Sequence, residues 1–130
     1  MIAVRSKTKF DKQKVRAKTR QGNITSLGHA GAAIRLTARR SIRTRQKPSP
    51  PGTPPHTRRG QLRRAIAYDV DKPRGVVVIG PERGAVGKSG SAHEFGGRYL
   101  RERYPKRSFM GPALEKLQDR LPDFLANSVR

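Results

Sequence analysis

The residues with the clearest chemical potential lie in the glycine-rich sequence GAVGKS at residues 84–89, which follows the apolar run VVVIG. It invites comparison with the phosphate-binding loop of nucleotide-binding proteins, in which backbone N–H groups and a lysine hold the phosphates. That loop requires a glycine five residues before its second glycine, and Glu82 stands at that position here. No clear helix start follows Ser89, and no later strand ends in an acidic residue that could hold magnesium. The pattern therefore favours a flexible hairpin or subunit-contact loop over a nucleotide site.

The other candidate chemical groups are three histidines and one glutamate. His29, His56 and His93 are not spaced so that two of them could share a metal ion, and the chain has no cysteine for a thiolate site or a disulfide. No serine stands in a nucleophile-elbow setting. Glu94 is a candidate general base, but no partner carboxylate is placed beside it, so pairing with one of the many arginines is favoured. We therefore expect no enzyme activity, no metal and no cofactor.

The formal net charge of +21 is distributed unevenly. Residues 1–64 hold 18 Lys and Arg and one acidic residue, a net of +17, whereas residues 65–130 hold 12 and eight, a net of +4. This asymmetry predicts a polyanionic neighbour or an acidic protein surface. Aromatic residues are only 5% and tryptophan is absent, so any nucleic-acid contact should be with backbone phosphate. The candidate contact residues are Arg35, Arg39, Arg40, Arg43 and Arg45.

The chain can form one modest hydrophobic core. Hydrophobic residues make up 33% of its 130 residues, which is low for a self-sufficient globular domain. Assembly with copies or partners is the natural way for such a protein to bury more area. No apolar stretch approaches the length of a membrane span, and the first residues lack the apolar run of a signal peptide. We therefore expect a protein without membrane contact that is soluble and intracellular when it is made.

The first half of the chain predicts a basic segment followed by a helix. Residues 1–22 suit either an edge strand or a basic arm that becomes ordered on assembly, because like charges one turn apart oppose an isolated helix between residues 12 and 20. Residues 23–45 carry an apolar stripe at helical spacing and are the expected long helix. Gly28 and Gly31 lie within it, and their expected use is the close approach of a sheet or a second helix.

The remaining elements form a single α+β domain over residues 23–130. Five prolines between residues 48 and 55 exclude a helix and a central strand from residues 46–60. That composition suits a disordered linker or a stiff strap, and we favour the strap because neither flank is large enough to fold alone. An antiparallel hairpin is expected at 66–80, a glycine-rich loop at 80–91, a basic loop at 98–107 and a C-terminal helix at 112–128, interrupted by Pro122 after about Arg120. The predicted fold is a long N-terminal helix packed on a small antiparallel sheet, with a proline-rich strap and a C-terminal helix.

Three separated segments carry a resemblance to a known family. They are SPPGTPPHTRRGQLRRAI at 49–66, HEFGG at 93–97 and YPKRSFMGPALEKL at 104–117. In this order they resemble the head–tail joining and tail-completion family of long-tailed bacteriophages and prophages, which is related to phage virion morphogenesis proteins. The resemblance covers roughly residues 24–128, and departures occur at Arg59, Ala65 and Ser108, where the family often has threonine, serine and proline. The residues that carry it are Pro51, Pro54, Pro55, Gly60, Leu62, Arg63, Ile66, Glu94, Phe95, Gly96, Phe109, Met110, Pro112, Ala113 and Leu114.

The resemblance implies a small structural subunit without enzyme activity. Members of the family form rings at the neck of the virion, between the head connector and the tail, around the path of the DNA. The resemblance implies that the chain binds copies of itself, connector (portal-side) proteins and tail proteins, and that it makes non-specific contact with packaged DNA. A minor capsid role in the same virion is a variant of this function. The alternative is a sequence-independent nucleic-acid-binding protein, nucleoid- or ribosome-associated. The turn glycines and bulky apolar residues of these segments predict that residues 61–66, 94–97 and 109–113 pack together at the subunit's centre.

Overall fold

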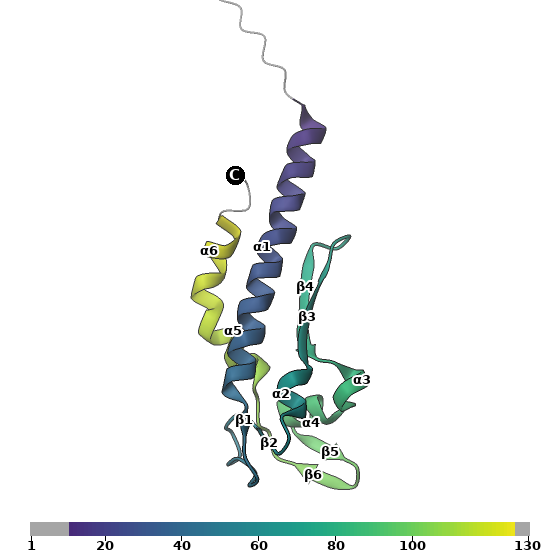
Figure 1. The fold of residues 1–130 in the computed structure, drawn as a ribbon, viewed down its shortest axis with the longest axis vertical. Coiled ribbons are helices and arrows are strands. Elements are labelled where there is room, and N and C mark those ends of the chain that lie inside the picture. The colour runs from purple at the N-terminus through teal and green to yellow at the C-terminus, as the bar shows by residue number, and fades with distance from the viewer. Residues whose placement is uncertain (1–10, 127–130) are drawn as a thin grey trace, which may run out of the picture.

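One long helix, α1 (Lys12–Ser41), runs through most of the length of the molecule (Figure 1). The structure, a computed structural model, describes residues 11–126. The expected α+β fold class, with a long N-terminal helix, small antiparallel sheets and a C-terminal helix, is confirmed. The other elements are β1 (Arg43–Thr44), β2 (His56–Thr57), α2 (Gln61–Ala65), β3 (Ile66–Asp71), β4 (Val76–Pro81), α3 (Arg83–Val86), α4 (Ser89–Phe95), β5 (Gly97–Tyr99), β6 (Glu102–Tyr104), α5 (Met110–Leu117), the 3-10 turn η1 (Gln118–Arg120) and α6 (Leu121–Ala126).

Helix α1 begins at Lys12, whereas the sequence predicted a start at Asn23. The prediction of an arm or strand over residues 1–22 is therefore wrong for residues 12–22. Residues 1–10 lie outside the described part of the chain. The Asp11 carboxylate caps the helix by accepting hydrogen bonds from the N–H groups of Gln13 and Lys14, at 3.1 and 3.2 Å. Such a cap contributes about 1 kcal/mol. Each like-charge pair costs only about 0.2–0.5 kcal/mol, so repulsion does not prevent the helix.

Helix α1 lies between two layers. The β3–β4 hairpin packs along one side, and α5 and α6 pack on the other (Figure 1). Gly31 permits the close approach of the hairpin, because a Cβ there would lie 2.7 Å from Val77 Cγ2 and 2.9 Å from Tyr68 Cδ2. The expectation of a close approach is met at Gly31 but not at Gly28, where a Cβ would meet nothing within 4 Å.

The hairpin is the most regular sheet of the molecule. Strands β3 and β4 pair antiparallel from Ile66 opposite Pro81 to Asp71 opposite Val76. The turn closes with a hydrogen bond of 2.8 Å from the Gly75 N–H to the Asp71 carbonyl, and Gly75 has a φ of +65° that favours glycine. The predicted hairpin at residues 66–80 thus differs from the observed one by a single residue at its end.

Three segments differ from the sequence prediction. The predicted helix at 23–45 ends at Ser41, and the chain after it pairs as β1 with β2 in a short parallel ladder. The predicted glycine-rich loop at 80–91 contains α3 and the start of α4, and the predicted basic loop at 98–107 contains the β5–β6 hairpin. In both cases short local hydrogen-bonded turns form within sequence that is rich in glycine or charge, which carries no apolar periodicity to signal them.

The C-terminal helix is split near Pro122, as predicted. Helix α5 ends at Leu117, η1 follows at Gln118–Arg120, and α6 begins at Leu121. Proline lacks the N–H that would bond to the Gln118 carbonyl four residues earlier, and its ring crowds that carbonyl. The start differs from the prediction, because α5 begins at Met110 rather than at Pro112.

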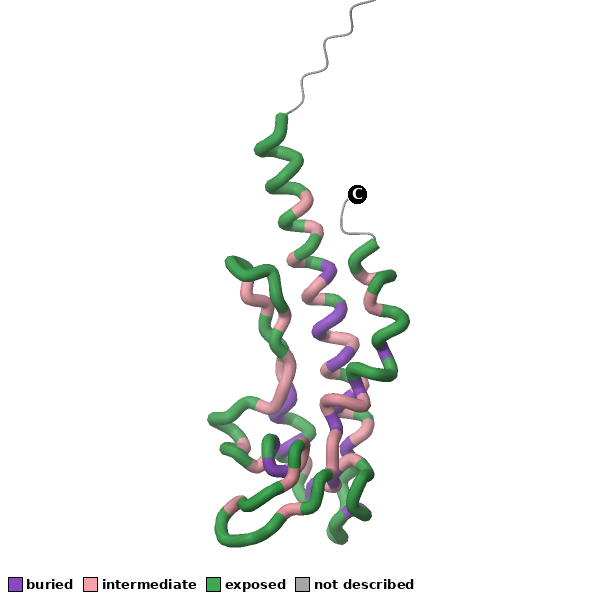
Figure 2. The backbone as a smooth tube through the Cα atoms, turned by 180° about the vertical axis from the view of Figure 1, so that it is seen from behind, coloured by how far each residue is buried: buried purple, intermediate pink, exposed green. Residues whose placement is uncertain are grey.

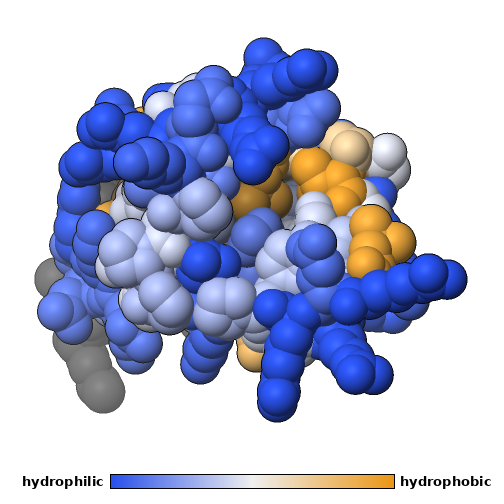
Figure 3. Space-filling model, turned by 90° about the horizontal axis from the view of Figure 1, so that it is seen from below, coloured by the Kyte–Doolittle hydropathy of each residue, from blue (hydrophilic) through white to orange (hydrophobic). Residues whose placement is uncertain are grey.

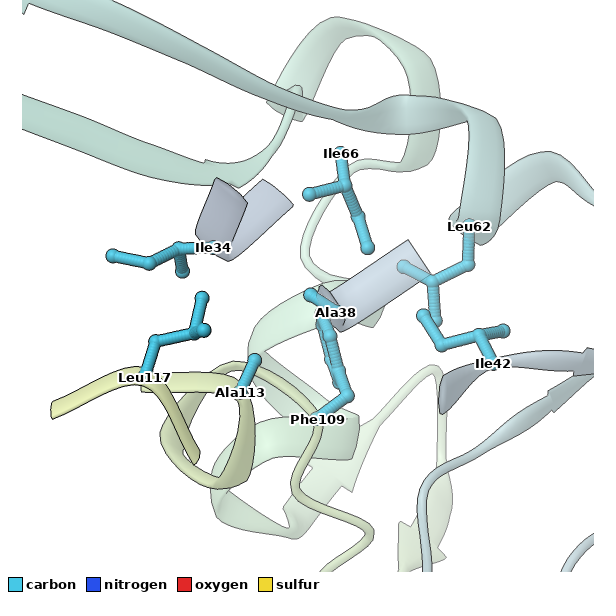
Figure 4. Close-up of a cluster of buried hydrophobic side chains, with 8 residues drawn as sticks. All are labelled: Ile34, Ala38, Ile42, Leu62, Ile66, Phe109, Ala113 and Leu117. Carbon is cyan, nitrogen blue, oxygen red and sulfur yellow. The ribbon is translucent and has the colours of Figure 1, made fainter. Parts of the chain in front are cut away.

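The hydrophobic core joins the second half of α1 to α2 and α5. Its buried cluster draws side chains from all three helices and from the residues between them (Figure 4). Burial rises along α1 from its exposed first turns to its buried second half (Figure 2). The cluster consists of Ile34, Ala38, Ile42, Leu62, Ile66, Phe109, Ala113 and Leu117.

Candidate functional site

Glu94 links two segments that are far apart in the sequence. It lies in α4, and its carboxylate accepts hydrogen bonds from the backbone N–H groups of Phe109, Met110 and Gly111 at 2.8, 2.9 and 2.9 Å. These N–H groups belong to the start of α5 and have no partners within their own helix. Phe109, the N-cap residue, makes no side-chain cap bond. Glu94 therefore caps α5 from a different helix.

The role predicted for Glu94, pairing with an arginine, is wrong within the described residues. The ion pair between Arg74 and Asp71 is the only one in that part of the chain, and Glu94 takes no part in it. A cap suits a carboxylate, because the positive end of the helix dipole and three N–H donors stabilise its charge together. Both of its oxygens are used in this cap, so they are not presented to a substrate as a general base would be.

Backbone contacts join the same two segments beside the cap. The Ser108 hydroxyl donates to the Glu94 carbonyl at 2.8 Å, and the Arg107 N–H donates to the His93 carbonyl at 2.7 Å. Gly96 turns the chain away after α4 with a φ of +72°, and a Cβ there would lie 3.2 Å from the Lys106 nitrogen. The HEFGG and RSFMGPAL segments are thus held together by side-chain and backbone bonds.

The proline-rich strap is tied to the same place. The Gly52 N–H donates to the Lys106 carbonyl at 2.9 Å, and the Arg107 Nε donates to the Ser49 carbonyl at 2.8 Å. Pro55 is fully buried, whereas Pro54 is half-buried and Pro51 is exposed. The strap therefore lies as ordered chain against residues 106 and 107.

Phe109 connects the cap to the core. Its side chain is fully buried and belongs to the same cluster as Leu62, Ile66 and Ala113 (Figure 4). Gly60 supplies the turn into α2 with a φ of +74°. We call this meeting point of residues 61–66, 93–96 and 106–113 the three-segment junction. It brings together the segments that carry the resemblance.

Not every residue expected at this centre lies within it. Phe95 is 77% exposed, so its predicted place at the centre is wrong. The residue after Glu94 on a helix points about 100° away from it, so Phe95 turns to solvent when Glu94 faces α5. Arg63 is exposed, and Met110 and Pro112 are half-buried.

His93 lies next to Glu94 with its ring half-buried. Burial lowers the pKa of His93, and the nearby positive charge of Arg107 lowers it further. Its Nδ1 atom is buried without a hydrogen-bond partner among residues 11–126, and the ring meets Tyr104 edge-on at 5.6 Å between centroids. These contacts favour the neutral imidazole.

The five arginines expected to contact a polyanion do not form one surface. Arg35 Nε donates to the Ile66 carbonyl at 2.9 Å, so this arginine braces α1 against β3. Arg39 is half-buried. Arg43 and Arg45 lie past the end of α1, in the segment that pairs with the strap. Arg40 and Arg43 line an exposed groove with Lys116, between the end of α1, the strap and α5.

The hairpin carries a surface that the sequence analysis did not single out. Residues paired across an antiparallel ladder share a face, so Asp69 lies beside Val78 and Asp71 beside Val76. The opposite face packs on α1 at Gly31 through Tyr68 and Val77. Val78 is 64% exposed and Val76 is 43% exposed. We call the outward face, defined by Asp69, Asp71, Val76 and Val78 with Glu82 just past the end of β4, the acidic hairpin face.

Seen from the end of the molecule opposite the start of α1, the surface is largely hydrophilic with a few exposed hydrophobic side chains (Figure 3). Within residues 11–126, no group of three His, Asp or Glu side chains is placed to hold a metal ion. Over the same range, no helix is both long enough and apolar enough to cross a membrane. No protein-family model, curated protein or solved structure significantly matches the chain.

Proposed function

We propose that this chain is a non-enzymatic structural subunit of a tailed-phage virion, which acts at the neck as a tail-completion protein. Its copies form a ring around the DNA path and join the head connector to the tail. The observation that carries the proposal is the three-segment junction. The segments that resemble the neck family are separated in sequence, yet Glu94 binds the start of α5 directly and Phe109 lies in the same buried cluster as Leu62 and Ile66.

The use of these residues supports a structural role. Glu94 caps α5, Gly96 turns the chain after α4 and Phe109 fills the core, so each of them serves the packing of the subunit. Large apolar side chains stay exposed elsewhere, with Phe95 at 77% and Leu100 at 76%. Exposed apolar side chains of this size suit contacts between subunits.

The implied partners are copies of this chain, connector and portal-side proteins, and tail proteins. Arg40, Arg43 and Arg45 are the exposed members of the arginine set, and they are the candidates for contact with packaged DNA or with an acidic connector surface. Arg35 is not a candidate, because its guanidinium already bonds to the Ile66 carbonyl.

Sedimentation velocity and negative-stain electron microscopy of the purified chain test this function. The proposal predicts closed rings, and it predicts that these rings bind purified connector or tail-tube assemblies. A chain that stays monomeric at every concentration and binds neither assembly would contradict it.

A second candidate function is sequence-independent binding of nucleic acid. It is favoured by the first turns of α1, where Lys12, Lys14, Arg16, Lys18 and Arg20 are exposed and no acidic residue lies among them. This alternative predicts a monomer whose affinity for duplex DNA falls steeply with salt and is the same for unrelated sequences. Titration of labelled duplexes at several salt concentrations separates the two functions.

A further inference from the structure

The first turns of α1 meet the rest of the described chain only along an open groove, where Val15, Arg16 and Thr19 lie near the hairpin turn and Leu125. They extend past the tip of the β3–β4 hairpin and past α6 (Figure 1, Figure 2). The last hydrogen bond to the hairpin turn runs from Arg20 Nη2 to the Lys72 carbonyl at 3.4 Å. Lys12 is eight residues earlier, so the helix continues about 12 Å beyond this contact at 1.5 Å per residue. Val15 is 46% exposed there, among cationic side chains.

This segment would gain from a partner of opposite charge. Lys12 and Arg16, Lys14 and Lys18, and Arg16 and Arg20 are like charges one helical turn apart, and such pairs destabilise a helix. Asp11 is the only acidic residue between residues 11 and 22, and its carboxylate is used in the cap. An acidic surface with some apolar character would neutralise the repulsion and cover Val15.

The acidic hairpin face has the complementary properties. A groove along the hairpin is lined by Asp69, Asp71 and Glu82 and by one cation, Lys72, in a protein whose net charge is +21. Asp71 pairs with Arg74 at 3.5 Å, whereas Asp69 and Glu82 make no ion pair with any residue from 11 to 126. The exposed Val78 is paired with Asp69 across the ladder and offers apolar area.

The two surfaces of one chain cannot meet each other. The acidic hairpin face points away from α1, because the opposite face of the hairpin is the one that packs on Gly31. The basic helix start also projects beyond the hairpin tip (Figure 1). A contact between these surfaces must therefore join two copies. Since the surfaces differ, the contact is head-to-tail, the kind that generates rings or filaments.

We infer that the basic start of α1, residues 12–20, docks on the acidic hairpin face of a second copy of this chain. Lysine and arginine side chains of the helix would meet Asp69 and Glu82, and Val15 would cover Val78. A polyanion cannot occupy the hairpin face, because like charges repel it. This inference rests on the proposed function insofar as both require self-assembly, but it adds the surfaces that make the contact.

Two charge-reversed variants test the contact. In the first, Asp69→Lys and Glu82→Lys reverse the hairpin face. In the second, Lys14→Glu and Lys18→Glu reverse the helix start. Each variant alone should associate roughly tenfold more weakly than the parent or worse, measured by sedimentation velocity. The matched control, Glu102→Lys with Glu115→Lys, makes the same change of charge at exposed acids outside the groove and should assemble like the parent.

Mixing the two variants is the decisive step. The normal helix of the first fits the normal face of the second, and the reversed helix of the second fits the reversed face of the first. The mixture should therefore assemble again, which a folding defect would not allow. Assembly of the parent with unimpaired single variants, or no recovery on mixing, would overturn the contact while the proposed function stands. A parent chain that never assembles would overturn both.

Discussion

The two halves of α1 lie in opposite environments. The second half is buried between the hairpin, α2 and α5 and carries Ile34, Ala38 and the neighbouring Ile42 of the core. The first half is mostly exposed and its only charged side chains are cationic, and a hydrogen bond to the hairpin turn comes from Arg20. One half is held by the chain's own core and by the three-segment junction. The first half carries exposed cationic side chains, a composition that suits a surface for binding another molecule.

The contrast between the two halves of α1 shows how a small core can support a long helix. Burial is concentrated where α1, α2 and α5 meet, and Glu94 fixes the position of α5 there with three bonds to its free N–H groups. The rest of α1 is available as a rigid extension.

The largest expected effect is at Phe109. Phe109→Ala removes a fully buried ring from the core cluster, and such truncations cost about 3–5 kcal/mol in the free energy of unfolding. Urea unfolding followed by circular dichroism measures it. A change within about 0.5 kcal/mol would mean that the ring is not buried.

The next effect is at Glu94. Glu94→Ala leaves three N–H groups at the start of α5 without their acceptor, and we expect a loss of about 1–3 kcal/mol in the free energy of unfolding. Glu94→Gln keeps one acceptor oxygen and should lose less. Glu115→Ala, at an exposed position on α5, is the control and should change the free energy of unfolding by less than about 0.5 kcal/mol. Equal effects of the Glu94→Ala and Glu115→Ala substitutions would refute the cap.

Two glycines of α1 separate packing from helix propensity. Alanine at either position gains about 1 kcal/mol of helix propensity. At Gly31 the new methyl group would lie 2.7 Å from Val77 Cγ2, and overpacking of this kind costs about 1–3 kcal/mol. We expect Gly28→Ala to raise the melting temperature and Gly31→Ala to lower it or leave it unchanged. A higher melting temperature for Gly31→Ala than for Gly28→Ala would place the hairpin farther from α1.

The smallest effect concerns pH. The folded-state pKa of His93 is lowered from 6.5 by burial and by Arg107, so the unfolded chain binds the proton more readily. Stability should therefore be fully present above pH 6.5 and fall as the pH drops from there through the lowered folded-state pKa. Urea unfolding across this range should show a shallower slope for His93→Gln than for the parent chain. Identical slopes would indicate that His93 is hydrated in the folded chain.

The sequence predicted the parts of the fold that carry periodic or stereochemical signals. The apolar stripe identified the second half of α1, alternating residues identified the hairpin, and Pro122 identified the break before α6. It failed at residues 12–22, where like-charge repulsion argued against a helix and the cap by Asp11 was not predicted. The short elements α3, β5 and β6 depend on local turns within glycine-rich or charged sequence. This sequence has no apolar periodicity that would predict them.

The site was predicted in outline but not in mechanism. Turn glycines and bulky apolar residues predicted that residues 61–66, 94–97 and 109–113 would meet, and Leu62, Ile66 and Phe109 do share one core cluster. The cap by Glu94 could not be predicted, because a carboxylate 15 residues from Phe109 has no fixed relation to it until the chain turns back. For the same reason the acidic hairpin face becomes visible only when the ladder places Asp69 and Val78 side by side.

Hydrogen–deuterium exchange along α1 tests directly whether its second half is held by the core while its first half is free to bind a second copy. In dilute protein, the amides of residues 30–41 should be the most protected of the helix, and those of residues 12–20 should exchange rapidly because little packs on them. At concentrations where the chain assembles, residues 12–20 should become protected together with the β3–β4 hairpin. Equal protection of both halves in dilute protein, or no change on assembly, would contradict the division of α1 into a held half and a binding half.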